Sequence, residues 1–133
     1  MQINKVEDAI RNLIGVFFDA GKLSLKLRSQ GLIEHIKKDK TPVTNGDIEV
    51  NNIILSSLKK ITPDIPIVSE ETAENKNLNL ETFWLVDPID GTYDYIHNRD
   101  EFTLNAGLII NKEAVAGIIY APAKDRMFYS YGN

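Results

Sequence analysis

The sequence predicts an α+β fold in which two N-terminal helices pack on a mostly antiparallel sheet. Two long segments in the first half carry apolar residues at helical spacing. The second half instead contains short runs of strand-forming residues, separated by turn-forming segments. Helices followed by strands are typical of helices that cover one face of an antiparallel sheet. The 133 residues suffice for one domain with a core, so we expect a single unit over residues 1–133.

Composition narrows the possible partners and locations. The formal net charge of −4 argues against nucleic acid as the main partner, because binding its phosphates takes a concentrated basic face. The chain has no cysteine, which excludes disulfides and thiolate metal sites and fits a reducing compartment. No apolar run approaches the roughly 20 residues needed to cross a bilayer. We therefore expect a cytoplasmic protein without membrane insertion.

The first helix is expected from about residue 4 to residue 30, with Gly31 as its stop. Its apolar residues recur at helical spacing: Val6, Ile10, Leu13, Ile14, Phe17 and Phe18. Such a stripe either packs in a core or binds a partner, and core packing is the favoured interpretation.

A second helix is expected after Thr44, ending before Pro63. Thr44 suits the N-cap, and Asp47 three residues later suits a capping pair, so Asp47 alone needs no catalytic role. Before this helix, residues 32–41 form a charged hairpin or loop with a basic cluster. Its Lys37 is either a solvated charge or a lysine near a bound anion.

Two short strands are expected at residues 65–68 and 83–86, and each runs into carboxylates. Glu70 and Glu71 follow the first strand, and Asp87 follows the second. Adjacent glutamates are usually surface charge, but strands of a parallel or mixed sheet can end at one edge, where α/β sites gather. The polar residues 73–81 between the strands are expected to form a surface loop or frayed helix.

The segment 87–92 (Asp-Pro-Ile-Asp-Gly-Thr) is the strongest candidate site. We expect a tight strand-to-helix turn that brings Asp87 and Asp90 together, and such oxygen ligands suit a hard divalent cation. The N–H groups of Gly91 and Thr92, at a helix start, suit an anion. The hypothesis is a cation and a phosphate side by side, and bound metal is required, because an acidic cluster otherwise repels phosphate.

Three strand-like runs follow this segment, at residues 102–110, 114–120 and 127–131. Turn-forming residues at 111–113 and 122–125 separate them. The pattern predicts an antiparallel meander.

Residues 84–92 (Trp-Leu-Val-Asp-Pro-Ile-Asp-Gly-Thr) resemble the signature of the inositol-monophosphatase-like, lithium-sensitive phosphatases. Residues 69–71 (Ser-Glu-Glu) resemble the glutamate-pair metal motif of that family. Residues 42–44 (Pro-Val-Thr) with Asp47 resemble its V-T-x-x-D motif, which follows a lysine-rich loop. Three motifs in the family's order are far more specific than a lone Asp-Gly-Thr.

The resemblance implies metal-assisted hydrolysis of a phosphate monoester, with two to three Mg²⁺ ions in the full site and Li⁺ as an inhibitor. The implied metal ligands are Glu70, Asp87, the backbone carbonyl of Ile89, and Asp90. The implied catalytic residues are Asp47, Thr92 and Glu70, with Thr92 and Asp47 orienting or deprotonating the attacking water. The implied phosphate-binding residues are Ile89, Asp90, Gly91 and Thr92. Glu71 and Lys37 are weaker candidates.

Finer features lean toward the bacterial 3'(2'),5'-bisphosphate nucleotidase branch, which converts adenosine 3',5'-bisphosphate to AMP and phosphate. Residues 37–44, 101–105 and 117–122 resemble that branch, whereas residues 93–95 (Tyr-Asp-Tyr) depart from its Lys-Glu-Phe. Inositol monophosphatase activity is the alternative. In either case the expected substrate is a small phosphorylated metabolite.

The resemblance covers only the N-terminal half of the layered αβαβα sugar-phosphatase fold. Family members are about twice this length, on the scale of a 250-residue domain. Their second half carries a Trp-Asp-x-Ala aspartate that completes the metal site, and the single tryptophan here, Trp84, belongs to another motif. A further alternative is therefore a truncated, weak or inactive half-domain of a split or degraded phosphatase. Its expected partners are a separately encoded C-terminal half or a second copy, bound through exposed C-terminal strands.

Overall fold

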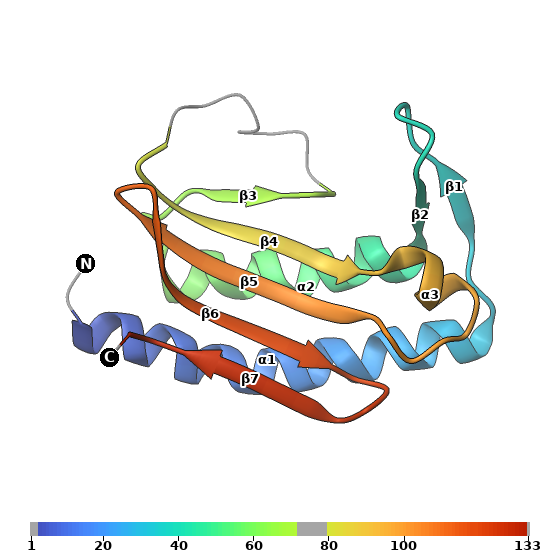
Figure 1. The fold of residues 1–133 in the computed structure, drawn as a ribbon, viewed down its shortest axis with the longest axis horizontal. Helices are drawn as coiled ribbons and strands as arrows, with labels where there is room; N and C mark the ends of the chain where they lie inside the picture. Colours follow the sequence, from blue (N-terminus) through green and yellow to red (C-terminus); the bar gives the residue numbers. More distant parts are fainter. Residues whose placement is uncertain (1–2, 72–79, 133) are drawn as a thin grey trace.

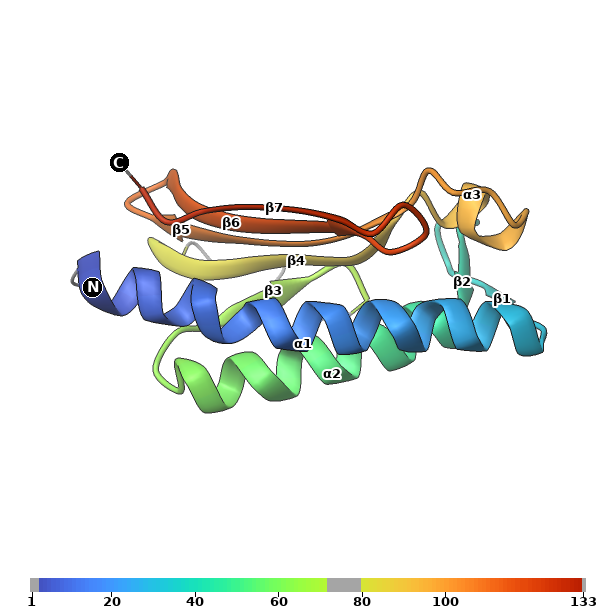
Figure 2. The same ribbon diagram turned by 90° about the horizontal axis from the view of Figure 1, so that it is seen from below.

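Two layers make up the molecule in the computed structural model, which describes residues 3–71 and 80–132. Helices α1 (Ile3–Gln30) and α2 (Asn45–Ile61) lie together on one face of a five-stranded sheet (Figure 2). The predicted α+β class is thus confirmed. No helix in the described ranges is long and apolar enough to span a bilayer.

Helix α1 buries the predicted apolar stripe. Ile10, Leu13 and Phe17 are fully buried in the core, whereas Phe18 is partly exposed. The helix stops where expected, since Gly31 has a positive φ of 94°. Core packing is therefore the role of this stripe.

Strands β1 (Glu34–Ile36) and β2 (Pro42–Thr44) pair as an antiparallel hairpin, which is one of the two forms expected for the charged segment. Helix α2 follows directly, with Thr44 as its N-cap in a complete capping box with Asp47. At its C-terminal end, the buried Thr62 accepts a hydrogen bond of 2.9 Å from the Trp84 indole. The second helix is confirmed with its predicted start.

The main sheet has the strand order β3-β4-β5-β6-β7. Its strands are β3 (Ile67–Ser69), β4 (Thr82–Asp90), β5 (Thr103–Ile110), β6 (Glu113–Ala121) and β7 (Arg126–Ser130). Only β3 and β4 are parallel, and β4 to β7 form the predicted antiparallel meander. Short helix α3 (Thr92–Ile96) joins β4 to β5 (Figure 1). The loop or frayed helix expected at 73–81 lies largely outside the described residues.

The two faces of the sheet differ in what covers them. Trp84 and Ile118 are fully buried against the helices, as alternation along β4 and β6 requires. The opposite face carries an apolar groove of about 540 Å³. Its apolar residues include Leu85, Ile119 and Phe128, which are 46%, 45% and 62% exposed, and Asp87 also borders it.

Candidate active site

One hollow of about 320 Å³ collects the predicted site residues. It is lined by residues of hairpin β1–β2, the ends of β3 and β4, and the start of α3, and Figure 1 shows the hairpin and α3 beside the end of β4. The predicted residues that line it are Lys37, Glu70, Glu71, Asp87, Ile89, Asp90, Gly91 and Thr92. Asp47 lies directly behind Thr92 and is fully buried. Segments far apart in sequence thus meet at one end of the sheet.

The parallel pairing of β3 and β4 places Glu70 beside Asp87. Ser69 is in register with Val86, and the Glu70 N–H donates to the Val86 carbonyl at 3.1 Å. The predicted convergence of the two strand ends at one edge is confirmed. Buried Asn51 of α2 accepts a hydrogen bond from the Ser69 hydroxyl, which fixes the chain just before the two glutamates.

The segment from Asp87 to Asp90 is the end of strand β4, not a turn after the strand as the sequence suggested. Asp87 pairs with Asn105 and Asp90 pairs with Thr103, so β4 has one residue more than β5 between these pairs. This extra residue makes a β-bulge, and Pro88, which lacks an N–H, falls within it. The bulge therefore lies between the two aspartates, and pairing with β5 continues through Asp90.

Asp47 uses its two carboxylate oxygens for two different partners. Oδ2 accepts from the Thr44 N–H at 2.8 Å and from the Thr44 hydroxyl at 2.6 Å, completing the cap of α2. Oδ1 accepts from the Thr92 hydroxyl at 3.0 Å. The capping role and the contact with Thr92 therefore coexist in one buried side chain.

Gly91 makes the close turn into α3 possible. Its φ of 91° lies in the left-handed region, and a Cβ there would lie 3.0 Å from the Glu101 carbonyl oxygen. Gly91 and Thr92 stand at the start of α3, so their N–H groups have no acceptor within the helix.

Lys37 contacts a carboxylate at the rim of the hollow. Its Nζ lies 3.5 Å from Glu71 Oε1, and the Glu71 side chain is largely buried. Burial raises the pKa of Glu71, and the charge of Lys37 opposes that rise. The pair thus fixes hairpin β1–β2 against the end of β3.

Burial and neighbouring negative charges act together on Asp87. The pKa of Asp87 is raised to about 7, first by burial and then by the charges of Asp90 and Glu70. Hard oxygen donors with excess negative charge are the donor set that a divalent cation prefers. Even so, within residues 3–71 and 80–132 no three His, Asp or Glu side chains are preassembled as a metal cluster. Metal ligation by Glu70, Asp87 and Asp90 therefore stays a prediction.

Sequence reasoning missed two polar side chains behind the hollow. Asn51, buried on α2, holds Ser69. Tyr95 of α3 is fully buried, and its hydroxyl donates to the Ser24 carbonyl at 2.6 Å. A polar residue on the apolar stripe of α2 is the only sequence signal for Asn51, and nothing local marks the partner of Tyr95.

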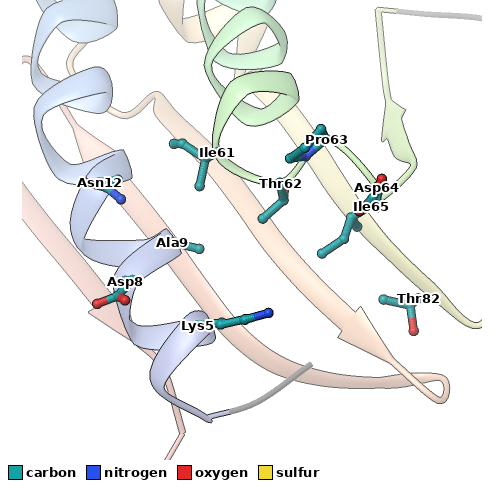
Figure 3. A pocket seen from close by; sticks show the side chains of 10 residues that line it. All are labelled: Lys5, Asp8, Ala9, Asn12, Ile61, Thr62, Pro63, Asp64, Ile65 and Thr82. Carbon is teal, nitrogen blue, oxygen red and sulfur yellow. The ribbon is translucent and has the colours of Figure 1, made fainter.

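A second hollow of about 520 Å³ lies at the other end of the helices, between the start of α1 and the turn after α2. Figure 3 shows its side chains, among them Lys5, Asp64 and Thr82. It contains none of the predicted site residues, so the smaller hollow remains the candidate active site.

Two bacterial proteins are similar to this chain in sequence. The 3'(2'),5'-bisphosphate nucleotidase CysQ of Salmonella typhimurium is 43% identical over 96 residues, which are 71% of this chain and 39% of the relative. CysQ of Buchnera aphidicola is 41% identical over 116 residues, covering 84% of this chain and 44% of the relative. The chain thus spans about two fifths of the length of these relatives.

Solved structures show the same fold. An IMPase of Thermotoga maritima matches with a TM-score of 0.82 at 27% identity, over 93% of this chain and 48% of the other. CysQ of Bacteroides thetaiotaomicron matches with a TM-score of 0.76 at 28% identity, over 96% and 46%. The inositol monophosphatase family matches residues 6–133, which is nearly the whole of this chain. The chain belongs to the inositol monophosphatase family.

Proposed function

We propose that this chain carries the catalytic half-site of a Mg²⁺-dependent phosphate monoester hydrolase. The observation that carries the proposal is the hydrogen bond between Thr92 and Asp47 at the edge of a hollow lined by five carboxylates. A hydroxyl held by a buried carboxylate can orient a water molecule and accept its proton in the same contact. Such a pair beside a cation site fits hydrolysis by direct attack of water.

The proposed cation ligands are Glu70, Asp87, the Ile89 carbonyl and Asp90. The fit rests on their chemistry, since they are oxygen donors in one hollow and the pKa of Asp87 is raised toward 7 by burial and its acidic neighbours. When bound, Mg²⁺ would polarise the phosphate and lower the pKa of a coordinated water. Glu70 would serve both as a ligand and as an orienting group for that water.

The proposed phosphate contacts come from residues 89–92. Gly91 lines the hollow with no side chain to block the approach, and its left-handed backbone turns the chain there. The Thr92 hydroxyl beside it is held by its hydrogen bond to Asp47. Lys37, paired with Glu71, would supply a positive charge at the rim.

The proposed substrate is a 3'(2'),5'-bisphosphate nucleotide, because relatives 41–43% identical bear the name of that nucleotidase. The alternative is an inositol monophosphate, since solved IMPases share the fold. Tyr93 borders the hollow and is 59% exposed, so it is the side chain of α3 that a substrate would meet first.

We further propose that full activity needs a second layer over the open sheet face. The chain spans 39–44% of the CysQ relatives, and the Trp-Asp-x-Ala aspartate expected in the family does not occur in its sequence. A separately supplied C-terminal half would contribute this carboxylate, and a second copy would only cover apolar surface. Losing one carboxylate from a shared metal site is expected to weaken the second ion at least about 10–100-fold.

The test is phosphate release from adenosine 3',5'-bisphosphate and from inositol 1-phosphate, with Mg²⁺ and with or without Li⁺. It should be run on the chain alone and on the chain mixed with the C-terminal half of a CysQ relative. We expect Li⁺-sensitive release that is greater in the mixture and greater for the bisphosphate. A preference for inositol 1-phosphate would support the alternative substrate.

Turnover absent from both samples, together with measurable Mg²⁺ binding by calorimetry, would identify an inactive metal-binding half-domain instead. Thr92→Val is the matched control, because it removes the hydroxyl that contacts Asp47 and keeps the shape of the side chain. Release that is unchanged in this variant would show that the Thr92 hydroxyl takes no part in the hydrolysis.

A further inference from the structure

Tyr95 of α3 contacts both long helices, α1 through Ser24 and α2 through Gly46. It is fully buried on α3, three residues after Thr92. Its backbone N–H donates to the Gly91 carbonyl at 2.9 Å, so it belongs to the same turn of chain that presents Gly91 and Thr92. A displacement of the Tyr95 ring would therefore also move the backbone of this turn.

The Tyr95 hydroxyl ties α3 to α1. It donates a hydrogen bond of 2.6 Å to the backbone carbonyl of Ser24, 71 residues earlier. Burial raises the pKa of Tyr95, and the charge of Asp47 raises it further, so the hydroxyl keeps its proton at working pH. Because the acceptor is a helix carbonyl, its position is set by the backbone of α1.

The ring of Tyr95 packs directly against the start of α2. A Cβ at Gly46 would overlap the hydroxyl and two ring carbons of Tyr95. Gly46 immediately precedes Asp47, so the absence of a side chain lets α3 approach the residue that holds Thr92. Close contact here fixes the separation of the two helices.

Arg28 of α1 closes the other side of Tyr95. Its guanidinium lies 5.6 Å from the centre of the Tyr95 ring and 5.0 Å from that of Phe102. The two rings are themselves 4.8 Å apart. Arg28 also donates to the Arg99 carbonyl at 2.6 Å, which holds the chain between α3 and β5. The Phe102 backbone in turn lies against Gly91.

We propose that Tyr95 is a positioning residue, whose hydroxyl bond to Ser24 holds the Thr92 hydroxyl in hydrogen-bonding distance of Asp47. The chemical consequence rests on the proposed function, but the geometry does not. If Tyr95 only filled the core, its ring alone would matter, and Tyr95→Phe would leave the position of Thr92 unchanged. The hydroxyl is therefore the group to test.

The test compares Tyr95→Phe with Tyr129→Phe in the full chain. Tyr129 is a half-exposed tyrosine on the edge strand β7, so its variant controls for loss of a hydroxyl. The first readout is the ¹³C-methyl NMR signal of Thr92 in threonine-labelled protein. We expect this signal to shift and broaden in Tyr95→Phe, because Thr92 samples further rotamers, and to stay unchanged in Tyr129→Phe.

The second readout is phosphate release in the presence of the C-terminal half of a relative. We expect kcat to fall about fivefold to tenfold with KM changed less than about twofold, since misplacing a catalytic contact lowers the rate more than it lowers binding. Gly46→Ala, which pushes the same ring, should give the same NMR signature. An unchanged Thr92 signal in both variants would overturn the proposal.

The two proposals fail separately. Absence of turnover in the parent chain would remove the proposed function, but the Thr92 methyl signal would still decide whether Tyr95 positions that residue. A fall in kcat that matches only a loss of folded protein, measured by the melting curve, would assign Tyr95 to core packing and overturn its positioning role.

Discussion

Thr92 and Asp47 are 45 residues apart in sequence and share a hydrogen bond of 3.0 Å. The same carboxylate caps helix α2 through its other oxygen. Asp47 is fully buried, and its position is fixed by the helix that it helps to start. Thr92 is therefore hydrogen-bonded to a carboxylate whose own position is fixed by secondary structure.

Asp47→Asn should destabilise the chain and abolish the proposed activity. In Asp47 one carboxylate oxygen accepts hydrogen bonds from Thr44 and the other accepts one from Thr92. The asparagine amide has an oxygen in only one of these two positions, so one of the two contacts is lost. We expect a loss of about 1–3 kcal/mol in the free energy of unfolding, measured with urea. Glu49→Gln is the control, because Glu49 is an exposed acid of the same helix start. Equal losses in the two variants would contradict the shared role of Asp47.

Thr92→Ser should retain most of the phosphate release seen with a C-terminal half, whereas Thr92→Val should lose it. General acid–base and positioning contacts of this kind contribute about 10²–10⁴-fold to rate. The Ser variant keeps the hydroxyl that reaches Asp47, and the Val variant keeps only the shape. Equal rates in both variants would show that the hydroxyl takes no part.

Gly91→Ala should cost more stability than Gly31→Ala. Both glycines have a left-handed φ, at 91° and 94°, so both substitutions carry a backbone penalty of about 1–2 kcal/mol. A Cβ at Gly91 would also press against the Glu101 carbonyl oxygen, whereas among the described residues no heavy atom lies within 4 Å of a Cβ built at Gly31. Urea unfolding of the two variants isolates the steric part of the effect. A larger loss for Gly31→Ala would be inconsistent with the close turn.

Mg²⁺ should raise the melting temperature more at pH 8 than at pH 5. The folded chain raises the pKa of Asp87 from 3.8 to about 7, so protonated Asp87 favours folding, and this contribution is lost as pH rises through that window. Above it the carboxylate is charged and a bound cation offsets the repulsion. Thermal melts with and without Mg²⁺ measure the difference. Asp87→Asn should abolish it, and the exposed Asp64→Asn should not.

Phe128→Glu should reduce self-association of the isolated chain. Phe128 is 62% exposed at the apolar groove, and uncovered apolar faces and edge strands favour association. Sedimentation at several concentrations measures the effect. Ile36→Glu is a matched control, because Ile36 is equally exposed but lies on hairpin β1–β2. A parent chain that stays monomeric at every concentration would contradict this expectation.

Local signals in the sequence were sufficient for most of the fold. The start of α2 follows from Thr44 and Asp47, whose side chains satisfy the first N–H groups of the helix. The meander follows from alternation and from its turn residues. The meeting of Glu70 with Asp87 follows from the tendency of strand ends to share an edge. Each depends on neighbours in sequence or on one simple rule of sheet geometry.

Other features depend on contacts between distant residues, and such contacts produce no periodic pattern in the sequence. The bulge that keeps Asp90 within β4 is set by pairing with β5, which the sequence of β4 alone does not specify. Ser24 contributes only its backbone carbonyl to Tyr95, so its side-chain identity carries no signal. Gly46 resembles an ordinary turn glycine, and only the packed structure shows that an aromatic ring occupies the space beside it.

Asp87 borders both the candidate active site and the apolar groove on the open sheet face. A layer that covered that groove would also remove water from one side of this carboxylate and so strengthen its attraction to a bound cation. If a partner covers the groove and a cation binds at Asp87, assembly and cation affinity would be thermodynamically linked through this single side chain. Each should promote the other by the same factor, which would make the metal content of the site a measure of how far its second layer has formed.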